Sequence, residues 1–299
     1  MPTFHPETAQ AELAPAKVNL TLRVRGRRSD GYHELQSLVA FADIGDTVAV
    51  ETGPPTGSDR LTITGPFAGG ITGENLLTRA VALLRAAHPH LAIGAVHLDK
   101  RLPVAAGLGG GSADAAALLR VVRSLNPTCV DAIPWMDIAA QLGSDVPVCF
   151  GNRPALIRGR GERISLVPSL PDMYAVLVNP LVPLATASVF AALKAGPTPV
   201  DAPDEPAPSL QGLAEVLGYM RGRGNDMEAA AVGLLSPIGE IKALLAVQPG
   251  CLHVAMSGSG PTCFAILSSE ADTRRAASAI AAARPDWWVA PIRLRGARR

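Results

Sequence analysis

PVAAGLGGGS, residues 103–112, separates a predicted strand from a predicted helix. Residues 95–99 alternate apolar and polar as a half-buried strand does, and residues 112–125 carry apolar side chains at helical spacing. Glycine lets the backbone approach an anion closely, and a helix start offers unpaired N–H groups at the positive end of the helix dipole. A strand, a glycine run and a helix together predict a cradle for phosphate.

Two common phosphate-binding motifs do not fit this loop. The Walker motif ends in Gly-Lys-Ser/Thr, but here Gly111 is followed directly by Ser112. The dinucleotide motif GxGxxG, begun at Gly107 and Gly109, would need its third glycine at position 112, and its acidic partner is also missing. A plain connector needs fewer glycines, so we expect a phosphate loop of another type. Ser112 is expected to cap the helix, to bind the phosphate or its magnesium ion, or both.

Length and charge exclude several classes of function. The 299 residues suffice for a sizeable core and most simply form two domains. Lys and Arg total 27 against 26 Asp and Glu, a net charge of +1, which argues against a nucleic-acid-binding surface. There is no apolar run of membrane-spanning length, no N-terminal signal pattern and no close pair among the four cysteines. We therefore expect a cytoplasmic chain that acts on a small molecule, with no nucleic-acid, membrane or obligate protein partner.

Strand and helix patterns alternate along the chain, which predicts an α/β (α+β) fold. Glycine and proline are dense near residues 151–170, so we place an N-terminal domain at 1–160 and a C-terminal domain at 161–299. Residues 195–209 contain five prolines and are expected to form a surface loop. The clearest further elements are strands at 174–178, 252–256 and 263–267 and helices at 75–87 and 137–142.

Lys17 and Asp145 are the candidate charged pair. Lys17 and Asn19 lie on the same face of a predicted strand, although a lysine there is often only a solvated charge. Asp145 follows a predicted helix and precedes Pro147, where an aspartate often merely caps a short helix. The functional alternative is phosphoryl transfer, in which Asp145 accepts the proton of an alcohol and Lys17 stabilises the developing charge.

Three further segments have a structural and a functional interpretation. Residues 27–35 predict a hairpin at Asp30-Gly31, whose Tyr32 either packs or stacks on a base that His33 reads. Residues 256–262 predict a serine–glycine turn between two strands. Residues 225–228 have the spacing of a capping box.

At these residues the chain resembles the GHMP kinase superfamily, over nearly its whole length. The motifs that carry the resemblance are residues 15–22, 103–113 and 257–261. The resemblance implies an N-terminal ATP-binding domain, a C-terminal ferredoxin-like domain and a cleft between them. It also implies transfer of a phosphate from ATP, with Mg²⁺, to an alcohol. The signature from Arg28 to His33 implies a cytidine-diphosphate-linked methylerythritol, phosphorylated on its 2-hydroxyl in non-mevalonate isoprenoid synthesis.

The resemblance also assigns roles to individual residues. It implies that Lys17 and Asp145 are catalytic and that Ser112 is a magnesium ligand. The implied acceptor site consists of Asn19, Tyr32, His33, Thr186 and Phe190, with cytosine between Tyr32 and Phe190 and hydrogen-bonded to His33. The implied ATP-binding residues are Asn75, Leu76, Lys100, Pro103, Val104, Ala105, Ala106, Gly107, Leu108, Gly109, Gly110, Gly111, Ser112 and Ala113, with Asn75, Leu76 and Lys100 near the adenine.

This chain departs from the family pattern at two places. It has Ala105-Ala106 where glycines are common, and Ala113-Asp114 where Ser-Asn often stand. These departures concern the detail of nucleotide and metal contacts. The alternatives are another kinase of the superfamily, of the homoserine or mevalonate type, a related decarboxylase, or an inactive nucleotide-binding sensor. An inactive sensor is expected to have lost Lys17 or Asp145, and this chain has both.

Overall fold

The computed structural model describes residues 9–51, 61–71, 75–198 and 205–297. The chain divides into two compact units. The helical unit consists of Met1–Ala16, Ile44–Val104 and Gly109–Asn152, and the sheet unit of Lys17–Asp43, Ala105–Leu108 and Arg153–Arg299. Strands β1 (Ala9–Asn19) and β3 (His33–Glu51) contribute residues to both units. The domain boundary at residue 160 stays a prediction, because this division reflects compactness and is discontinuous in sequence.

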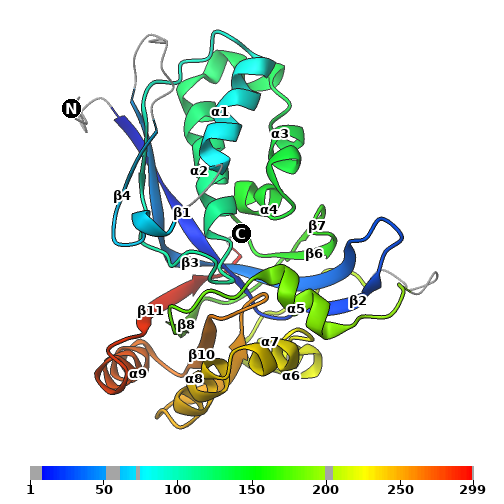
Figure 1. Ribbon diagram of the computed structural model, residues 1–299, viewed down its shortest axis with the longest axis vertical. Helices are drawn as coiled ribbons and strands as arrows, with labels where there is room; N and C mark the ends of the chain where they lie inside the picture. The colour runs from blue at the N-terminus through cyan, green and yellow to red at the C-terminus, as the bar shows by residue number, and fades with distance from the viewer. Residues whose placement is uncertain (1–8, 52–60, 72–74, 199–204, 298–299) are drawn as a thin grey trace. The chain divides into compact units, whose positions relative to one another are not determined.

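The helical unit combines a small sheet with a group of helices. Strand β5 (Val96–Asp99) pairs antiparallel with β3 and parallel with β4 (Leu61–Thr64). The helices α1, α2, α3 and α4 lie together (Figure 1) and pack on one another. They span Leu76–Ala87, Gly110–Leu125, Trp135–Leu142 and Val146–Gly151, and two short 3₁₀ helices span Ala68–Gly70 and Pro127–Ala132.

Helix α2 is the centre of the helical unit. Most of its residues from Ala113 to Val122 are buried, and several of them are alanines. Small side chains let α1, α3 and α4 approach α2 closely. Each fully buried leucine, such as Leu118 and Leu119, contributes about 1.5–3 kcal/mol relative to exposure. The helix that follows the glycine loop is therefore held firmly by its own packing.

The sheet unit is built on an antiparallel sheet with the order β3-β11-β8-β10-β9. Leu177 in the central strand β8 (Met173–Asn179) lies opposite Phe264 on one side and Ala290 on the other. The neighbouring strands are β9 (Cys251–Met256), β10 (Cys263–Leu267) and β11 (Trp288–Arg295). Strands β2 (Arg23–Arg27) and β6 (Ala155–Gly159) both pair with β3, and β7 (Arg163–Leu166) pairs with β6.

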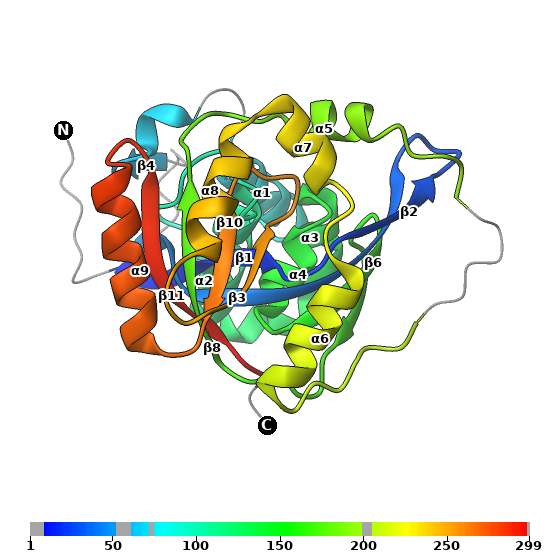
Figure 2. The same cartoon turned by 90° about the horizontal axis from the view of Figure 1, so that it is seen from below.

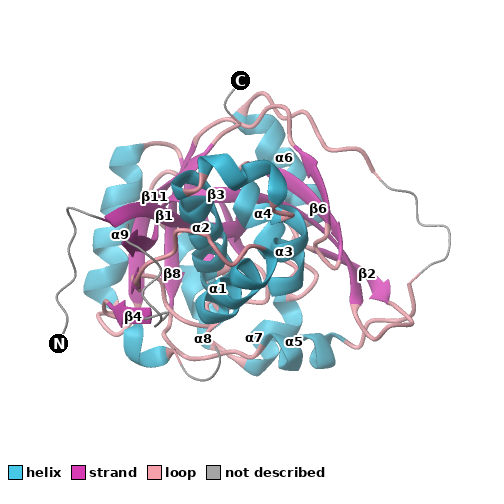
Figure 3. Ribbon diagram, turned by 90° about the horizontal axis from the view of Figure 1, so that it is seen from above, coloured by secondary structure: helices cyan, strands magenta, loops and turns pink. Residues whose placement is uncertain are grey.

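Helices cover this sheet and complete a ferredoxin-like arrangement. Helix α8 (Pro237–Ala246) packs on β9 and β10, and α9 (Glu270–Ala283) packs on β8 and β11 (Figure 2). Ile238 and Ile280 are among the core residues that they contribute. The strand order β11-β8-β10-β9 with helices after β8 and β10 is the βαββαβ pattern. Figure 3 distinguishes these strands from their helices, and the remaining helices are α5 (Thr186–Leu193), α6 (Leu213–Arg223) and α7 (Glu228–Leu234).

Most of the predicted elements are found. The predicted helix 75–87 is α1, whose N-cap Asn75 accepts a hydrogen bond from the Leu77 amide, and the predicted strand 263–267 is β10. Of the proline-rich segment 195–209, residues 199–204 lie outside the described residues, and residues 205–209 have no helix or strand. Among the described residues no single helix has the length and apolar character to cross a membrane, while α7 and α8 pass that test only together, as a bent pair.

Candidate active site

The glycine loop leads into α2 earlier than the sequence predicted. Helix α2 begins at Gly110, and its N-cap is Gly109 with φ +63°. The prediction that Ser112 caps this helix is therefore wrong, because Gly109 adopts the left-handed conformation and its carbonyl accepts the Ala113 amide. The N–H groups of Gly110, Gly111 and Ser112 occupy the first turn, where a helix has no acceptors of its own.

Gly111 leaves room beside these amides. A Cβ atom added at Gly111 would meet only Leu76 Cδ1, at 3.8 Å. The fold therefore has no steric need for glycine at this exposed position of α2, where glycine is less favourable than alanine by about 1 kcal/mol. An open space beside the N-terminus of a helix fits the close approach of a phosphate.

Gly107 is required by the fold itself. Its φ is +73°, and an added Cβ would lie 2.6 Å from the Ser257 carbonyl oxygen and 2.7 Å from that of Gly260. The hydroxyl of Ser257 donates to the Gly107 carbonyl at 3.0 Å, and the Lys17 amide donates to the Leu108 carbonyl at 2.9 Å. Residues 105–108 thus lie between β1 and the late glycine loop. Parts of the three sequence motifs, from residues 17–19, 105–108 and 257–260, come together in the sheet unit.

The late glycine loop, residues 257–261, is held by two asparagines. The amide nitrogen of the Asn225 side chain donates to the Met256 and Gly258 carbonyls, both at 2.8 Å. The Asn19 backbone amide donates to the Ser257 hydroxyl at 3.1 Å. The capping-box prediction at 225–228 is wrong, since the N-cap of α7 is Met227 and makes no side-chain capping bond. The side-chain oxygen of Asn225 accepts the Met227 amide at 3.0 Å, just before α7, and its amide nitrogen fastens this segment to a loop far away in sequence.

The predicted acceptor residues lie in the sheet unit in two groups. Thr186, the first residue of α5, shares a hydrogen bond with Ser259 in the late glycine loop at 2.8 Å between their hydroxyl oxygens. The ring of Phe190, one turn further along α5, stacks on His33 with 4.3 Å between ring centroids and 15° between planes. Burial, with a smaller effect of Arg27, lowers the pKa of His33, so this imidazole is neutral at pH 7.

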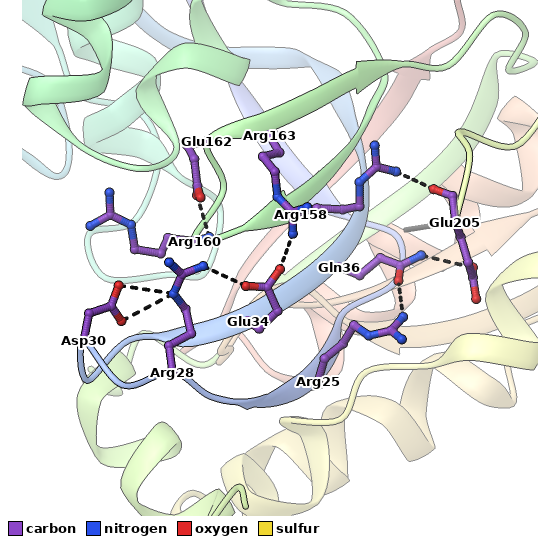
Figure 4. A network of polar contacts seen from close by, with 10 residues as sticks. All are labelled: Arg25, Arg28, Asp30, Glu34, Gln36, Arg158, Arg160, Glu162, Arg163 and Glu205. Carbon is purple, nitrogen blue, oxygen red and sulfur yellow. Dashed lines mark hydrogen bonds and ion pairs between the residues drawn. The ribbon is translucent and has the colours of Figure 1, made fainter. Parts of the chain in front are cut away.

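Tyr32 lies at the tip of the hairpin between β2 and β3. Its side chain is exposed, and the guanidinium of Arg160 lies 4.8 Å from the centre of its ring. Ion pairs of Glu34 with Arg28 and with Arg163 connect this hairpin to β7, as Figure 4 shows. Phe190 stacks on His33 rather than on Tyr32, so the placement of a base between Tyr32 and Phe190 stays a prediction.

The two candidate catalytic side chains lie in different units. Lys17 is buried near the end of β1 in the sheet unit. Asp145 in the helical unit is the N-cap residue of α4, but its carboxylate makes no capping hydrogen bond. Arg120 fixes α4 from α2 by donating to the Cys149 carbonyl at 2.6 Å. The simple interpretation of Asp145 as a helix cap therefore loses its main support.

The helical unit also contains a buried charge cluster that the sequence did not reveal. Lys100 Nζ donates to Asp46 Oδ2 at 2.5 Å and to Asp114 Oδ2 at 2.7 Å. Burial raises the pKa of Asp114 against the opposing charge of Lys100, whereas for Lys100 the two carboxylates outweigh burial and raise its pKa. No signal in the sequence indicated this cluster, because the buried Asp46 lies in the same strand as Asp43, which is exposed.

The remaining predicted site residues are those expected to bind the nucleotide and the magnesium ion. Pro103, Ala106 and Leu108 are buried in the loop, whereas Val104 and Ala105 are exposed. Among the described residues no group of three or more His, Cys, Asp and Glu could hold a metal. A magnesium ion that arrives with ATP takes most of its ligands from phosphate and water. The partly exposed Ser112 hydroxyl in the first turn of α2 fits such an ion.

Two family profiles match the chain. The profile of the GHMP kinases N terminal domain matches residues 75–153, and that of the GHMP kinases C terminal domain matches residues 207–286. A protein of Methylobacterium radiotolerans named 4-diphosphocytidyl-2-C-methyl-D-erythritol kinase is 47% identical over 293 residues, which cover 96% of this chain and all of that protein. A protein of the same name from Paramagnetospirillum magneticum is 46% identical over 283 residues, 94% of this chain and 97% of that protein.

Solved structures agree with these matches. The crystal structure of a 4-(cytidine 5′-diphospho)-2C-methyl-D-erythritol kinase superposes with a TM-score of 0.74 at 34% identity, over 95% of this chain and 99% of that one. A homoserine kinase from Cytophaga hutchinsonii superposes with a TM-score of 0.64 at 16% identity, over 100% and 98% of the two chains. Because the sequence identity is only 16%, the similarity to the homoserine kinase concerns the fold alone.

Proposed function

The chain belongs to the GHMP kinase family, and from this premise we propose that it phosphorylates the 2-hydroxyl of 4-diphosphocytidyl-2-C-methyl-D-erythritol with ATP. The product would be a precursor in non-mevalonate isoprenoid synthesis. Membership of a kinase family implies ATP as the phosphate donor. The choice of acceptor rests on one observation, the identity of 47% to a kinase of this name along its whole length. The hairpin with Tyr32 and His33 supports the same choice.

In this proposal the glycine loop holds the triphosphate. The amides of Gly110, Gly111 and Ser112 and the N-terminal end of the α2 dipole face the anion. The space beside Gly111 lets the phosphate come close. Asn75, Leu76 and Lys100 belong to the nucleotide site, the first two at the start of α1. Magnesium would neutralise charge on the transferred phosphate, and Ser112 is the residue that we propose to hold it.

The chemical step needs a proton acceptor and a cation. We assign the acceptor role to Asp145, whose carboxylate takes or orients the proton of the attacking hydroxyl. Lys17 stabilises negative charge on the transferred phosphate. Asn19 and Thr186 hold the acceptor alcohol. Such a site works by positioning and electrostatics, which phosphoryl transfer mainly requires.

The cytidine end is assigned to the hairpin and α5. Tyr32 and Phe190 would enclose the cytosine ring, and His33 would hydrogen-bond its polar edge. A neutral imidazole has one donor and one acceptor nitrogen, which suits a base edge with both. His33 and Phe190 already stack on each other. In this proposal the cytosine therefore binds beside two aromatic rings that are in contact.

The first experiment is a direct assay. The purified chain with ATP, magnesium and 4-diphosphocytidyl-2-C-methyl-D-erythritol is expected to give ADP and the 2-phosphate. Mevalonate and homoserine, which lack a cytidine group, are expected to be poor acceptors. Preferred turnover of either would make the chain a different kinase of the family. ATP binding without ADP formation from any acceptor would support an inactive sensor.

The second experiment tests Asp145. Asp145→Asn is expected to lower kcat by about 10²–10⁴-fold, the usual contribution of a general base, while ATP binding measured by calorimetry is retained. Asp137→Asn, which changes an exposed carboxylate on α3 of the same unit, is the matched control and is expected to keep its activity. A fully active Asp145→Asn enzyme would remove Asp145 as the base.

A further inference from the structure

The buried cluster of Lys100, Asp46 and Asp114 joins the two ends of the glycine loop within the helical unit. Asp46 Oδ1 accepts the backbone amides of Arg101 at 2.6 Å and Leu102 at 2.7 Å, just before the loop. Its other oxygen accepts Lys100 Nζ, which also donates to Asp114 on α2, just after the loop. All three side chains are at most 5% exposed. Lys100 is thus the link between the chain before the loop and the helix after it.

Gly110 shows how tightly this link is built. A Cβ atom at Gly110 would lie 3.1 Å from Lys100 Nζ and 3.6 Å from Asp46 Oδ2. A side chain at the first residue of α2 would therefore press on the lysine amine, which would have to shift between its two carboxylates. The geometry of the cluster and the start of the phosphate-binding helix depend on each other.

A glycine loop needs such a constraint from outside. Glycines have no side chains that could pack and fix the loop, and they lose more backbone entropy on ordering than other residues. A buried charge cluster is a costly way to gain stability, since well-packed apolar side chains often serve as well or better. Its value lies in fixed directions and distances, because charged hydrogen bonds tolerate little displacement.

We propose that Asp46, Lys100 and Asp114 are positioning residues that set the separation between the two ends of the phosphate loop, so that Lys100 supports nucleotide binding through its carboxylate partners. This inference rests on the proposed function only in that the loop binds the phosphates of ATP. The lysine amine donates to both carboxylates, and a ligand without a base separates this support of the loop from contact with adenine.

The test measures nucleotide binding in the absence of any acceptor. The parent, Asp114→Leu, Asp114→Asn and Lys100→Met are compared by calorimetry with ATP and magnesium, and by competition with inorganic tripolyphosphate, which has no base. Arg101→Gln is the matched control. Arg101 follows Lys100 directly in the chain, but its side chain forms an ion pair with Asp99 at the surface. Thermal unfolding of each variant reports whether it folds.

Asp114→Leu removes the acceptor of a charged hydrogen bond and is expected to weaken binding of ATP about tenfold or more. Tripolyphosphate binding falls by the same factor, and kcat at saturating ATP changes little. Asp114→Asn retains an acceptor oxygen and is expected to bind ATP nearly as the parent does, as is Arg101→Gln. Lys100→Met, where folded, weakens both ligands equally.

Two results would overturn the proposal. Parent-like ATP binding by a folded Asp114→Leu variant would show that the link is dispensable. A loss in Lys100→Met confined to ATP, with tripolyphosphate binding unchanged, would assign Lys100 to the base. If Lys100→Met does not fold, the comparison of Asp114→Leu with Asp114→Asn decides. Failure of the parent to bind ATP at all would instead contradict the proposed function.

Discussion

The hydroxyl of Ser257 donates a hydrogen bond to the carbonyl oxygen of Gly107 across 3.0 Å. The same hydroxyl oxygen accepts the backbone amide of Asn19 at 3.1 Å. One side chain therefore ties together the phosphate loop, the N-terminal strand and the late glycine loop of the sheet unit. Because Ser257 is fully buried, water cannot replace it as a partner for either backbone group.

Ser257→Ala removes both of these hydrogen bonds. A buried backbone group left without a partner costs about 1–3 kcal/mol, so we expect the free energy of unfolding to fall by about 2 kcal/mol or more. The KM for ATP should rise as well, since residues 105–108 lose a support. Urea unfolding and initial rates measure the two effects. Ser169→Ala is the control, because that hydroxyl shares an exposed hydrogen bond with Ser209. An equal loss in both variants would contradict the argument.

Gly107 and Gly111 should respond oppositely to alanine. Gly107→Ala places a Cβ at a φ of +73° and 2.6 Å from the Ser257 carbonyl oxygen, and we expect it to destabilise the fold by about 2 kcal/mol or more. Gly111→Ala meets only Leu76 and improves helix propensity, so it should stabilise the fold by about 0.5–1 kcal/mol.

The affinity for ATP tests the role of Gly111 further. Gly111→Ala is expected to weaken ATP binding in spite of its gain in stability, because its methyl group occupies the space that we assign to phosphate. Thermal unfolding and calorimetry on the same samples check both statements. Unchanged ATP affinity in Gly111→Ala would mean that the phosphate lies elsewhere along the loop.

The sequence predicted local structure well where patterns are local. The apolar spacing after Asn75 and the unbroken apolar run from Cys263 placed α1 and β10 correctly. The start of α2 was placed two residues late, because the order of three successive glycines does not reveal that Gly109 takes the left-handed conformation. Rules for capping then favoured Ser112.

Contacts between distant residues were out of reach. The side-chain oxygen of Asn225 makes a local bond with the Met227 amide, but its amide nitrogen donates to carbonyls 31 and 33 residues away. Asp46 and Lys100 are 54 residues apart, and no short motif includes both. The family resemblance supplied the residues of the candidate site, while the bonds that hold those residues come from the fold.

Ala105 is the one departure from the family pattern that carries backbone strain. Its φ is +53°, a conformation that costs an L-residue about 1–2 kcal/mol. Ala105→Gly removes this cost and adds about 0.5–1 kcal/mol of unfolded-state entropy, so we expect a net gain of up to about 1 kcal/mol in thermal unfolding. Its neighbour is the matched control: Ala106 is buried without a positive φ, and Ala106→Gly should destabilise. Equal effects of the two substitutions would exclude strain at Ala105.

Asp114 should make stability depend on pH in an unusual direction. Burial raises the pKa of its carboxyl from 3.8 to about 8, so between these values the folded chain holds a proton that the unfolded chain releases. Stability from this group is fully present at low pH and is lost as pH rises, by up to about 1.4 kcal/mol per pH unit. Asp114→Asn does not titrate, so its unfolding free energy should fall less than the parent's between pH 5 and about 8. Urea unfolding at several pH values measures how the unfolding free energy of the parent and of Asp114→Asn changes with pH. Equal changes in the two proteins would mean that Asp114 does not hold a proton in the folded chain.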